Sequence, residues 1–327
     1  MLSIPHLLRR LSRRASARVE GCAPLEEDEA FALWGAVLDG ALPEVELGAL
    51  LASLAIAGET PGELLGLHRA LAARQAKFAA PLPRRPVAIP LHGLVAGEAA
   101  FCVLLALFLR RFDVPVALHG PLDAPEAPSG PALLREMGVM PSATLAEAEH
   151  GLRSAGIAFL PAQLLSPALG DLLALRSRLG TTNAAHLAAQ ALDPGAAGAV
   201  RLAMWVPGTA SARLEGFLPS TGGEALLLAW PAATRACNLE FRPRISRISG
   251  GAQSVLFEAD PSDRAAGAGP PEARDLLPWM RAIVERRAPA PPPLVNLAAA
   301  CVHAAGAAPD FTQAKAIVAL QAGRLAA

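Results

Sequence analysis

The sequence has no tyrosine, only two lysines among its 29 basic residues, and four scattered cysteines. No pair of cysteines has the CxxC spacing of a zinc knuckle, and a chain of 327 residues does not depend on a disulfide framework. We therefore expect reduced thiols at Cys22, Cys102, Cys237 and Cys301. Aromatic residues make up 4% of the chain, which leaves few side chains for stacking on nucleic-acid bases.

Long apolar runs are also missing. The run Ala99–Leu109 has 11 residues, whereas a membrane-spanning helix needs about 20. Residues 1–18 carry five arginines but lack an apolar core followed by a small-residue cleavage site, so they do not resemble a secretory signal. We expect a cytoplasmic protein that does not associate with a membrane.

Familiar catalytic motifs do not occur in the sequence. It contains no HExxH, no GxSxG, no cluster of His and Cys ligands and no aspartate-rich metal motif. The sequence therefore gives no support to a hydrolase or a metal-dependent enzyme of familiar type. We expect neither a metal site nor a bound cofactor.

The composition is that of a globular protein of about two domains, with 53% hydrophobic and 18% charged residues. The 29 basic and 29 acidic residues cancel overall, but not locally. Residues 69–111 hold seven basic residues and one acidic one, residues 153–247 hold nine and five, and residues 1–18 hold five arginines and no acid. Such segments favour polyanion binding, although charge runs are more often solvated surface.

Residues 25–76 have a helical pattern. Thr60, Pro61 and Glu63 give one helix an N-cap, a first-turn proline and a capping-box acid. The pattern predicts three short antiparallel helices, in a domain of residues 1–80 that is completed by about 164–192. Three helices are too few to bury every apolar face, so we expect exposed side chains that a second copy would cover, namely Leu47, Leu50, Leu51 and Leu54.

Short apolar runs alternate with helical segments over the rest of the chain. Strands are expected at 87–90, 114–118, 157–160, 199–206, 224–230 and 253–258. This alternation predicts an α/β domain of residues 86–160 and 195–327, built on a mostly parallel sheet. The fold class is therefore a small N-terminal helical bundle joined to a larger α/β domain.

Histidine–glycine pairs follow two of these strands, at His92-Gly93 and His119-Gly120. Ligands of parallel sheets bind at the carboxyl ends of the strands, so the pairs could hold an anion; the alternative is a histidine that satisfies a loop backbone. Arg176 and Arg178 lie near a predicted helix end, where they either bind phosphates or complement the helix dipole.

Several stretches resemble the anthranilate phosphoribosyltransferase family of glycosyltransferase family 3. The resemblance lies in residues 38–52, 58–66, 116–120, 156–169, 176–180 and 295–300. It implies a nucleoside phosphorylase/phosphoribosyltransferase-like fold and a homodimer that forms through the helical domain.

The family's functional motifs are altered in this sequence. Its Gly-Thr-Gly-Gly-Asp diphosphate loop would fall on Pro90–Leu94, and its Asn after His-Gly is Pro121. The arginine that contacts anthranilate would fall on Thr182, and Glu224 alone remains near the family's magnesium-binding Asp-Glu pair. By resemblance, ordinary phosphoribosyl transfer lacks its clamp, its metal and its acceptor contact.

The stretch Arg176-Ser-Arg-Leu-Gly-Thr-Thr-Asn-Ala-Ala-His186 is similar to the YbiB-type paralogues of that family. These paralogues bind nucleic acid without marked sequence preference. The resemblance thus implies a single-stranded nucleic acid as partner and phosphate contacts from arginines of four segments, which are Arg9, Arg10, Arg13, Arg14, Arg84, Arg85, Arg176 and Arg178.

A second hypothesis is a glycosyl or phosphoribosyl transferase with an altered donor site. The fold keeps a cleft at the sheet edge, and fold alone does not decide function. The residues expected to line this cleft are His92, Gly93, His119, Gly120, Asn183 and His186. Oligonucleotide binding separates the two hypotheses from each other.

Overall fold

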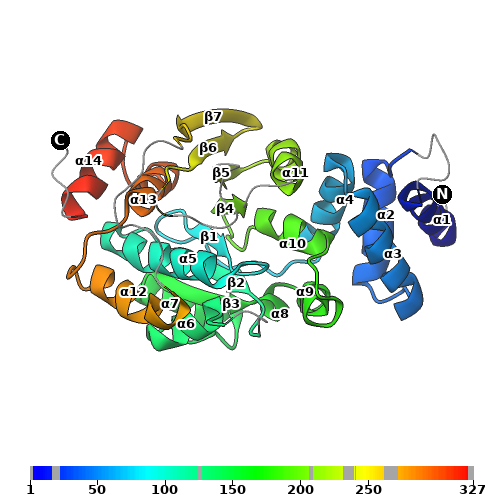
Figure 1. Ribbon diagram of the computed structural model, residues 1–327, viewed down its shortest axis with the longest axis horizontal. Helices are drawn as coiled ribbons and strands as arrows, with labels where there is room; N and C mark the ends of the chain where they lie inside the picture. Colours follow the sequence, from blue (N-terminus) through cyan, green and yellow to red (C-terminus); the bar gives the residue numbers. More distant parts are fainter. Residues whose placement is uncertain are drawn as a thin grey trace.

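The computed structural model describes residues 3–16, 23–123, 127–205, 209–230, 239, 241–260 and 272–322. A bundle of N-terminal helices lies at one end of the molecule, a twisted sheet covered by helices lies in the middle, and the C-terminal helix lies at the other end (Figure 1). α1 (Ile4–Ala15) and α14 (Phe311–Gln321) are therefore far apart.

The N-terminal bundle contains four helices: the three predicted in residues 25–76 are present, and one more precedes them. They are α1 (Ile4–Ala15), α2 (Glu27–Leu38), α3 (Glu44–Ala57) and α4 (Pro61–Ala72). The additional helix is α1, in the segment expected as a basic arm. Leu7 and Leu11, one turn apart, are buried where α1 packs on α3.

This additional helix changes what α3 exposes. Leu50, Leu51 and Leu54 are buried and Leu47 is half-buried, so the expectation that they are exposed is wrong. The cause is α1, which covers the face of α3 that a three-helix bundle would leave open.

The start of α4 confirms the predicted capping box. The Thr60 hydroxyl accepts a hydrogen bond from the Glu63 N–H at 3.2 Å, and the Glu63 carboxylate accepts one from the Thr60 N–H at 2.9 Å. Two amides that have no partner within the helix are thereby satisfied.

Three helices from the middle of the chain lie against this bundle. They are α8 (Ala162–Leu165), α9 (Pro167–Leu179) and α10 (Ala184–Ala188). Leu169, Leu172 and Leu187 belong to the same apolar cluster as Leu33 and Leu64 of the bundle, and α10 packs on α4. The middle segment thus shares its core with the N-terminal helices.

The sheet has seven strands in the order β3-β2-β1-β4-β5-β6-β7. They are β1 (Val87–Pro90), β2 (Val116–Gly120), β3 (Ile157–Pro161), β4 (Val200–Trp205), β5 (Glu224–Ala229), β6 (Arg244–Ser249) and β7 (Ala252–Phe257). β1 to β5 are parallel, while β6 and β7 are added antiparallel. The predicted α/β class with a mostly parallel sheet is confirmed, although the sequence did not predict β6.

Alternate residues of the strands face two different cores. Leu202 and Met204 of β4 join the cluster under the helices α5 (Ala96–Leu109), α12 (Leu276–Val284) and α13 (Pro292–Ala304), whereas Ala203 faces the bundle side. The remaining helices are α6 (Gly130–Glu136), α7 (Leu145–Ser154), α11 (Thr209–Phe217) and α14 (Phe311–Gln321). Both faces of the parallel part of the sheet are therefore covered, which explains why β1, β2, β3 and β5 are almost wholly buried, whereas β7 at the end of the sheet is largely exposed.

Because β1 to β5 are parallel, they all begin on one side of the sheet and all end on the opposite side, and we call these two sides its amino and carboxyl edges. The carboxyl edge is where these strands end, at Pro90 and Gly120 for β1 and β2, and the amino edge is where they begin, at Val87 and Val116. Within the described ranges, no helix has both the length and the apolar character needed to cross a bilayer.

Candidate functional site

Three histidines meet at the carboxyl edge. His92 follows β1 and His119 lies in β2, with their ring centroids 5.8 Å apart, and the ring of His186 on α10 lies 6.0 Å from that of His92. Their exposed fractions are 4% for His92, 1% for His119 and 5% for His186. The structure thus brings together three of the residues expected in the cleft.

Two glycines allow this close approach. Gly93 has a φ of +75°, and a Cβ atom there would lie 3.5 Å from the His186 ring and 3.6 Å from Thr182. A Cβ on Gly120 would lie 3.2 Å from the backbone of Leu91. Gly93 therefore gives the loop after β1 its left-handed backbone, and Gly120 leaves room for that loop against β2.

Asn183 and His186 have a local structural role. The Asn183 side chain accepts a hydrogen bond from the Ala185 N–H at 3.0 Å and donates one to the Leu172 carbonyl at 2.8 Å. The Asn183 N–H donates to Nδ1 of His186 at 3.2 Å. These bonds cap α10 and join it to α9, so Asn183 has little freedom to bind a ligand.

The histidine cluster is neutral near pH 7. Burial lowers the pKa of His119 to about 4, and burial together with the charge of Arg176 lowers the pKa of His186 to about 4. Burial also lowers the pKa of His92 far below its usual value, and His119 and His186 lower it further. An anion at this edge would thus meet imidazoles without charge.

Some imidazole nitrogens in this cluster have no partner. Both ring nitrogens of His92 are buried and make no hydrogen bond within the described part of the chain. The same is true of Nε2 of His119. The backbone of Ala189 lies near the His92 ring and weakly raises its pKa, against the effect of burial. The two groups do not meet the geometry of a hydrogen bond. Buried polar atoms without partners are unfavourable, so these nitrogens could accept or donate a bond to a ligand.

A metal site is not formed by the described residues: among them, no three His, Cys, Asp or Glu side chains are arranged to hold an ion. Glu224, which the resemblance places near the family's magnesium-binding pair, lies at the amino edge, where β5 begins. Its carboxylate forms an ion pair with Arg247 and accepts a hydrogen bond from the Ser249 hydroxyl at 3.1 Å. Glu224 is thus part of a structural network away from the histidines.

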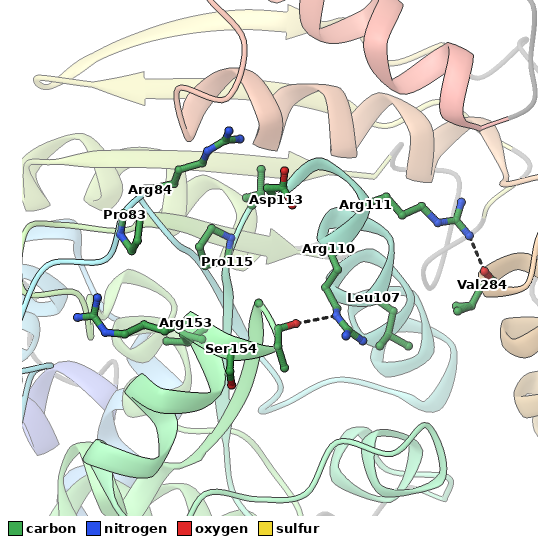
Figure 2. Close-up of a pocket in the computed structure, with 14 residues that line it drawn as sticks. Pro83, Arg84, Leu107, Arg110, Arg111, Asp113, Pro115, Arg153, Ser154 and Val284 are labelled. Atoms are coloured by element: carbon green, nitrogen blue, oxygen red, sulfur yellow. Dashed lines mark hydrogen bonds between the residues drawn. The ribbon is translucent and has the colours of Figure 1, made fainter.

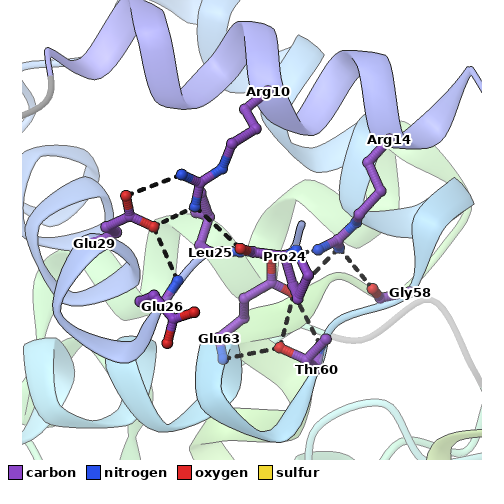
Figure 3. Close-up of polar contacts among 9 residues, drawn as sticks. All are labelled: Arg10, Arg14, Pro24, Leu25, Glu26, Glu29, Gly58, Thr60 and Glu63. Atoms are coloured by element: carbon purple, nitrogen blue, oxygen red, sulfur yellow. Dashed lines mark hydrogen bonds and ion pairs between the residues drawn. The ribbon is translucent and has the colours of Figure 1, made fainter. Parts of the chain in front are cut away.

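The four arginines of α1 divide into two pairs. Arg10 forms an ion pair with Glu29, and Arg14 binds the buried carboxylate of Glu63 at 2.6 Å (Figure 3). Arg9 and Arg13 are exposed to solvent on the opposite side of the helix from Leu7 and Leu11. Arg10 and Arg14 therefore hold α1 on the bundle through carboxylates, which leaves Arg9 and Arg13 as the pair on α1 that faces solvent.

The remaining predicted arginines lie at different edges. Arg84 and Arg85 precede β1 at the amino edge, where Arg85 lies 3.4 Å from Glu224 and Arg84 donates to the Phe112 carbonyl at 3.2 Å. Arg176 and Arg178 end α9 near the histidines, with Arg176 half-buried and Arg178 exposed. These basic segments do not form one surface.

The structure also adds arginines that sequence reasoning missed. Arg110 and Arg111 at the end of α5 and Arg153 near the end of α7 line a groove of about 540 Å³ with Arg84. The surplus of basic residues in 69–111 was the available signal for Arg110 and Arg111, but nothing local joins them to Arg153.

A helical bundle at one end of a mostly parallel sheet defines a class of protein, the phosphoribosyltransferase-like scaffold. The crystal structure of anthranilate phosphoribosyltransferase from Thermus thermophilus has this fold, with a TM-score of 0.70 at 20% identity over 94% of this chain and 93% of that one. The enzyme from Saccharomyces cerevisiae in complex with PRPP and Mg has a TM-score of 0.64 at 10% identity, with 98% of this chain and 94% of that one covered.

Sequence comparison defines the relationship further. Residues 6–74 match the helical bundle domain of the glycosyl transferase family. YbiB from Escherichia coli (strain K12), described as an uncharacterized protein, is 30% identical over 87% of this chain and 90% of its own length. When aligned by sequence, anthranilate phosphoribosyltransferase of Thermus thermophilus is 27% identical over 90% of this chain and 89% of its own length. The chain belongs to glycosyl transferase family 3, as the resemblance predicted.

Proposed function

We propose that this protein binds nucleic acid, with a preference for single strands and little dependence on sequence, as a homodimer built on a phosphoribosyltransferase-like scaffold. The observation that carries the proposal is the division of arginines on α1. Two of them fix the helix through Glu29 and Glu63, while Arg9 and Arg13 are left exposed.

The exposed pair is arranged to meet a polyanion. Arg9 and Arg13 are four residues apart, so their like charges lie one turn apart and repel each other by a few tenths of a kcal/mol. Arg9 donates only to its own helix, at the Pro5 carbonyl, and neither side chain has a carboxylate partner among the described residues. Backbone phosphates would supply the missing negative charge.

The carboxyl edge supports the same proposal because it has few groups that would bind a sugar diphosphate. Its three histidines are neutral, the family's diphosphate loop falls on Pro90–Leu94, and Thr182 replaces the arginine that contacts anthranilate. Phosphoribosyl transfer needs charge stabilisation at this edge, and the groups named here carry no positive charge, so the stabilisation would have to come from Arg176 and Arg178 at the end of α9.

An exposed apolar stripe on α3 supports the homodimer. Val45, Ala49, Ala52 and Ile56 recur at intervals of four and three residues and are all exposed, with Val45 at 82% and Ile56 at 72%. Such spacing gives a helix one continuous apolar side, and its small residues allow a second helix to approach closely. A second copy of α3 related by a twofold axis would cover it.

Oligonucleotide binding tests the main proposal. Unrelated single strands should bind with similar affinity, and log K should fall with log salt by about 0.7 for each neutralised phosphate. The double substitution Arg9→Gln and Arg13→Gln should weaken binding of all strands alike and flatten this slope by about 1.4. Arg274→Gln, which alters an exposed arginine far along the chain, should change neither.

The proposal fails if the wild-type protein binds no strand at low salt. If the folded double variant keeps the full salt slope, α1 is excluded as the binding surface. Circular dichroism of both variants keeps a folding defect apart from a binding defect.

The homodimer is tested on α3. Light scattering should give twice the chain mass for wild type and the monomer mass for Ile56→Glu, because a carboxylate cannot be buried unpaired in an apolar interface. Met140→Glu alters another exposed apolar residue and should stay dimeric. A monomeric wild type at micromolar concentration would contradict the proposed interface.

A transferase with an altered donor site is the second candidate function, and the unpartnered nitrogens of His92 and His119 favour it. Those atoms could bind a neutral sugar hydroxyl. Turnover of phosphoribosyl pyrophosphate with magnesium that disappears in His119→Asn would support this candidate; no turnover above background would remove it.

A further inference from the structure

The groove at the amino edge lies at the end of the sheet opposite the histidines. It is lined by Arg84 before β1, Arg110 and Arg111 after α5, and Arg153 near the end of α7, together with one acid, Asp113. Figure 2 shows these side chains around the hollow, with Arg110 between the ends of α5 and α7. Its volume of about 540 Å³ lies in the range of small-molecule sites.

The arginines of the groove are bonded mainly to neutral oxygens. Arg110 donates through Nε to the Ala155 carbonyl at 2.9 Å, and Arg111 donates to the Ile283 and Val284 carbonyls at 3.0 and 2.6 Å. Among the described residues no carboxylate pairs with Arg84, Arg110 or Arg111, and Arg153 lies 4.0 Å from Glu149. A carbonyl fixes the position of a guanidinium but leaves its positive charge in place.

The alternative reading is that these arginines only complement helix ends, because α5, α7 and α12 all end at this groove. Each helix C-terminus carries about half a negative charge. Three such ends, Asp113 and the Glu149 carboxylate beside Arg153 therefore offset most of the charge of the four arginines, and about half a positive charge stays uncompensated. Burial lowers the pKa of Arg111, and the like charge of Arg286 lowers it further.

The guanidiniums also keep donors for a ligand. An arginine has five N–H donors. Arg110 uses only its Nε, Arg84 uses only Nη1, and Arg153 uses only Nη2 for hydrogen bonds within the described chain. The remaining N–H donors suit a phosphate, because a guanidinium can donate two parallel hydrogen bonds to two phosphate oxygens.

We propose that this groove binds a phosphate-bearing anion of nucleotide size. The phosphate belongs either to a free nucleotide or to the terminal nucleotide of a strand, and the chemistry of recognition is the same. The site is separate from α1, so it goes beyond the proposed function and does not depend on it.

Calorimetry with adenosine 5′-diphosphate tests the groove, with adenosine as the ligand that lacks phosphate. At low ionic strength the diphosphate should bind and adenosine should not. The double substitution Arg110→Gln and Arg153→Gln should weaken binding by about tenfold or more, because two charge-assisted contacts are lost. Arg281→Gln, an exposed arginine outside the groove that pairs with Glu136, is the matched control and should bind like wild type.

Ser154→Glu gives an independent variant that keeps every arginine. Ser154 is exposed at the lining of the groove, so a carboxylate there should repel the phosphate without disturbing the fold. The proposal is overturned if the diphosphate does not bind, if adenosine binds equally well, or if binding persists unchanged in both groove variants.

Oligonucleotides identify the source of the phosphate. If a 5′-phosphorylated strand binds tighter than its 5′-hydroxyl form, and the groove variants abolish the difference, the ligand is a strand end. If both strands bind alike while the diphosphate binds in the groove, the ligand is a free nucleotide. Loss of strand binding in the α1 variant with diphosphate binding retained separates this site from the proposed function.

Discussion

The two edges of the sheet differ in the charge of the side chains that they carry. At the carboxyl edge, His92, His119 and His186 are buried and neutral, and their environment resists protonation. At the amino edge, Arg84 and Arg110 are exposed and donate hydrogen bonds to neutral carbonyl oxygens. Parallel α/β sheets ordinarily bind ligands at the carboxyl edge. In this chain the capacity to bind anions has a stronger basis at the opposite edge.

The largest expected effect concerns the carboxylate that balances charge at the amino edge. Glu224→Ala should lower the free energy of unfolding by about 3 kcal/mol, because Arg247 loses its partner in a partly buried site. Urea denaturation measures the change. Glu258→Ala, whose ion pair with Arg244 is exposed, should cost under about 1 kcal/mol. If both variants lose the same free energy of unfolding, the ion pairs of Glu224 contribute no more than an exposed ion pair does.

The second effect is a pH dependence at the carboxyl edge. An unfolded histidine binds a proton below a pH of about 6.5, whereas folded His119 stays neutral down to about 4. Stability is therefore full above that range and falls as the pH drops through it. His119→Gln should remove about 1.4 kcal/mol per pH unit from the slope within this window.

Urea denaturation at several pH values between 4 and 7 checks this slope. His150→Gln replaces an exposed histidine on α7 and should leave the slope as in wild type. His119→Gln with an unaltered slope would show that the imidazole is not buried in its neutral form, and the contrast between the edges would disappear.

The sequence predicted the scaffold better than the charged surfaces. Five strands of the parallel sheet and the capping box at Thr60 were readable because each depends on a local pattern. β6 was missed because Arg244 and Arg247 interrupt its apolar pattern, and the partners of Arg247 are Glu224 of the neighbouring strand and His303 of α13. A strand whose polar side chains are satisfied by residues of other elements has no pattern of its own from which it can be predicted.

The arginines show the same limit. Arg9 and Arg10 are adjacent in the sequence, yet one is exposed and the other binds Glu29, because only the packing of α1 decides which side faces the bundle. The spacing of Leu7 and Leu11 was the signal for that helix. The groove joins segments around 84, 110 and 153, which are brought together only by the sheet.

A smaller effect tests how tightly the carboxyl edge is built. Gly93→Ala should lower the free energy of unfolding by about 1 to 2 kcal/mol, because a φ of +75° is unfavourable for alanine. The space around the new Cβ is ordinary, so the cost comes from the backbone alone. Gly62→Ala in α4, where nothing lies within 4 Å, should be neutral or slightly stabilising. If the two variants behave alike, the loop after β1 is not held rigidly against His186.

The smallest expected effect decides whether the arginines of the amino edge serve the fold or a ligand. Arg110→Gln removes one hydrogen bond to the Ala155 carbonyl, an exposed group that water can satisfy, so the free energy of unfolding should change by less than about 1 kcal/mol. Arg281→Gln loses a similar bond to the Glu136 carbonyl and should change it equally little. Thermal unfolding without ligand measures both. A loss above about 2 kcal/mol for Arg110→Gln alone would mean that this guanidinium mainly supports the end of α7. The amino edge would then differ from the carboxyl edge in architecture rather than in binding, whereas a small loss leaves a charged groove that the fold itself does not need.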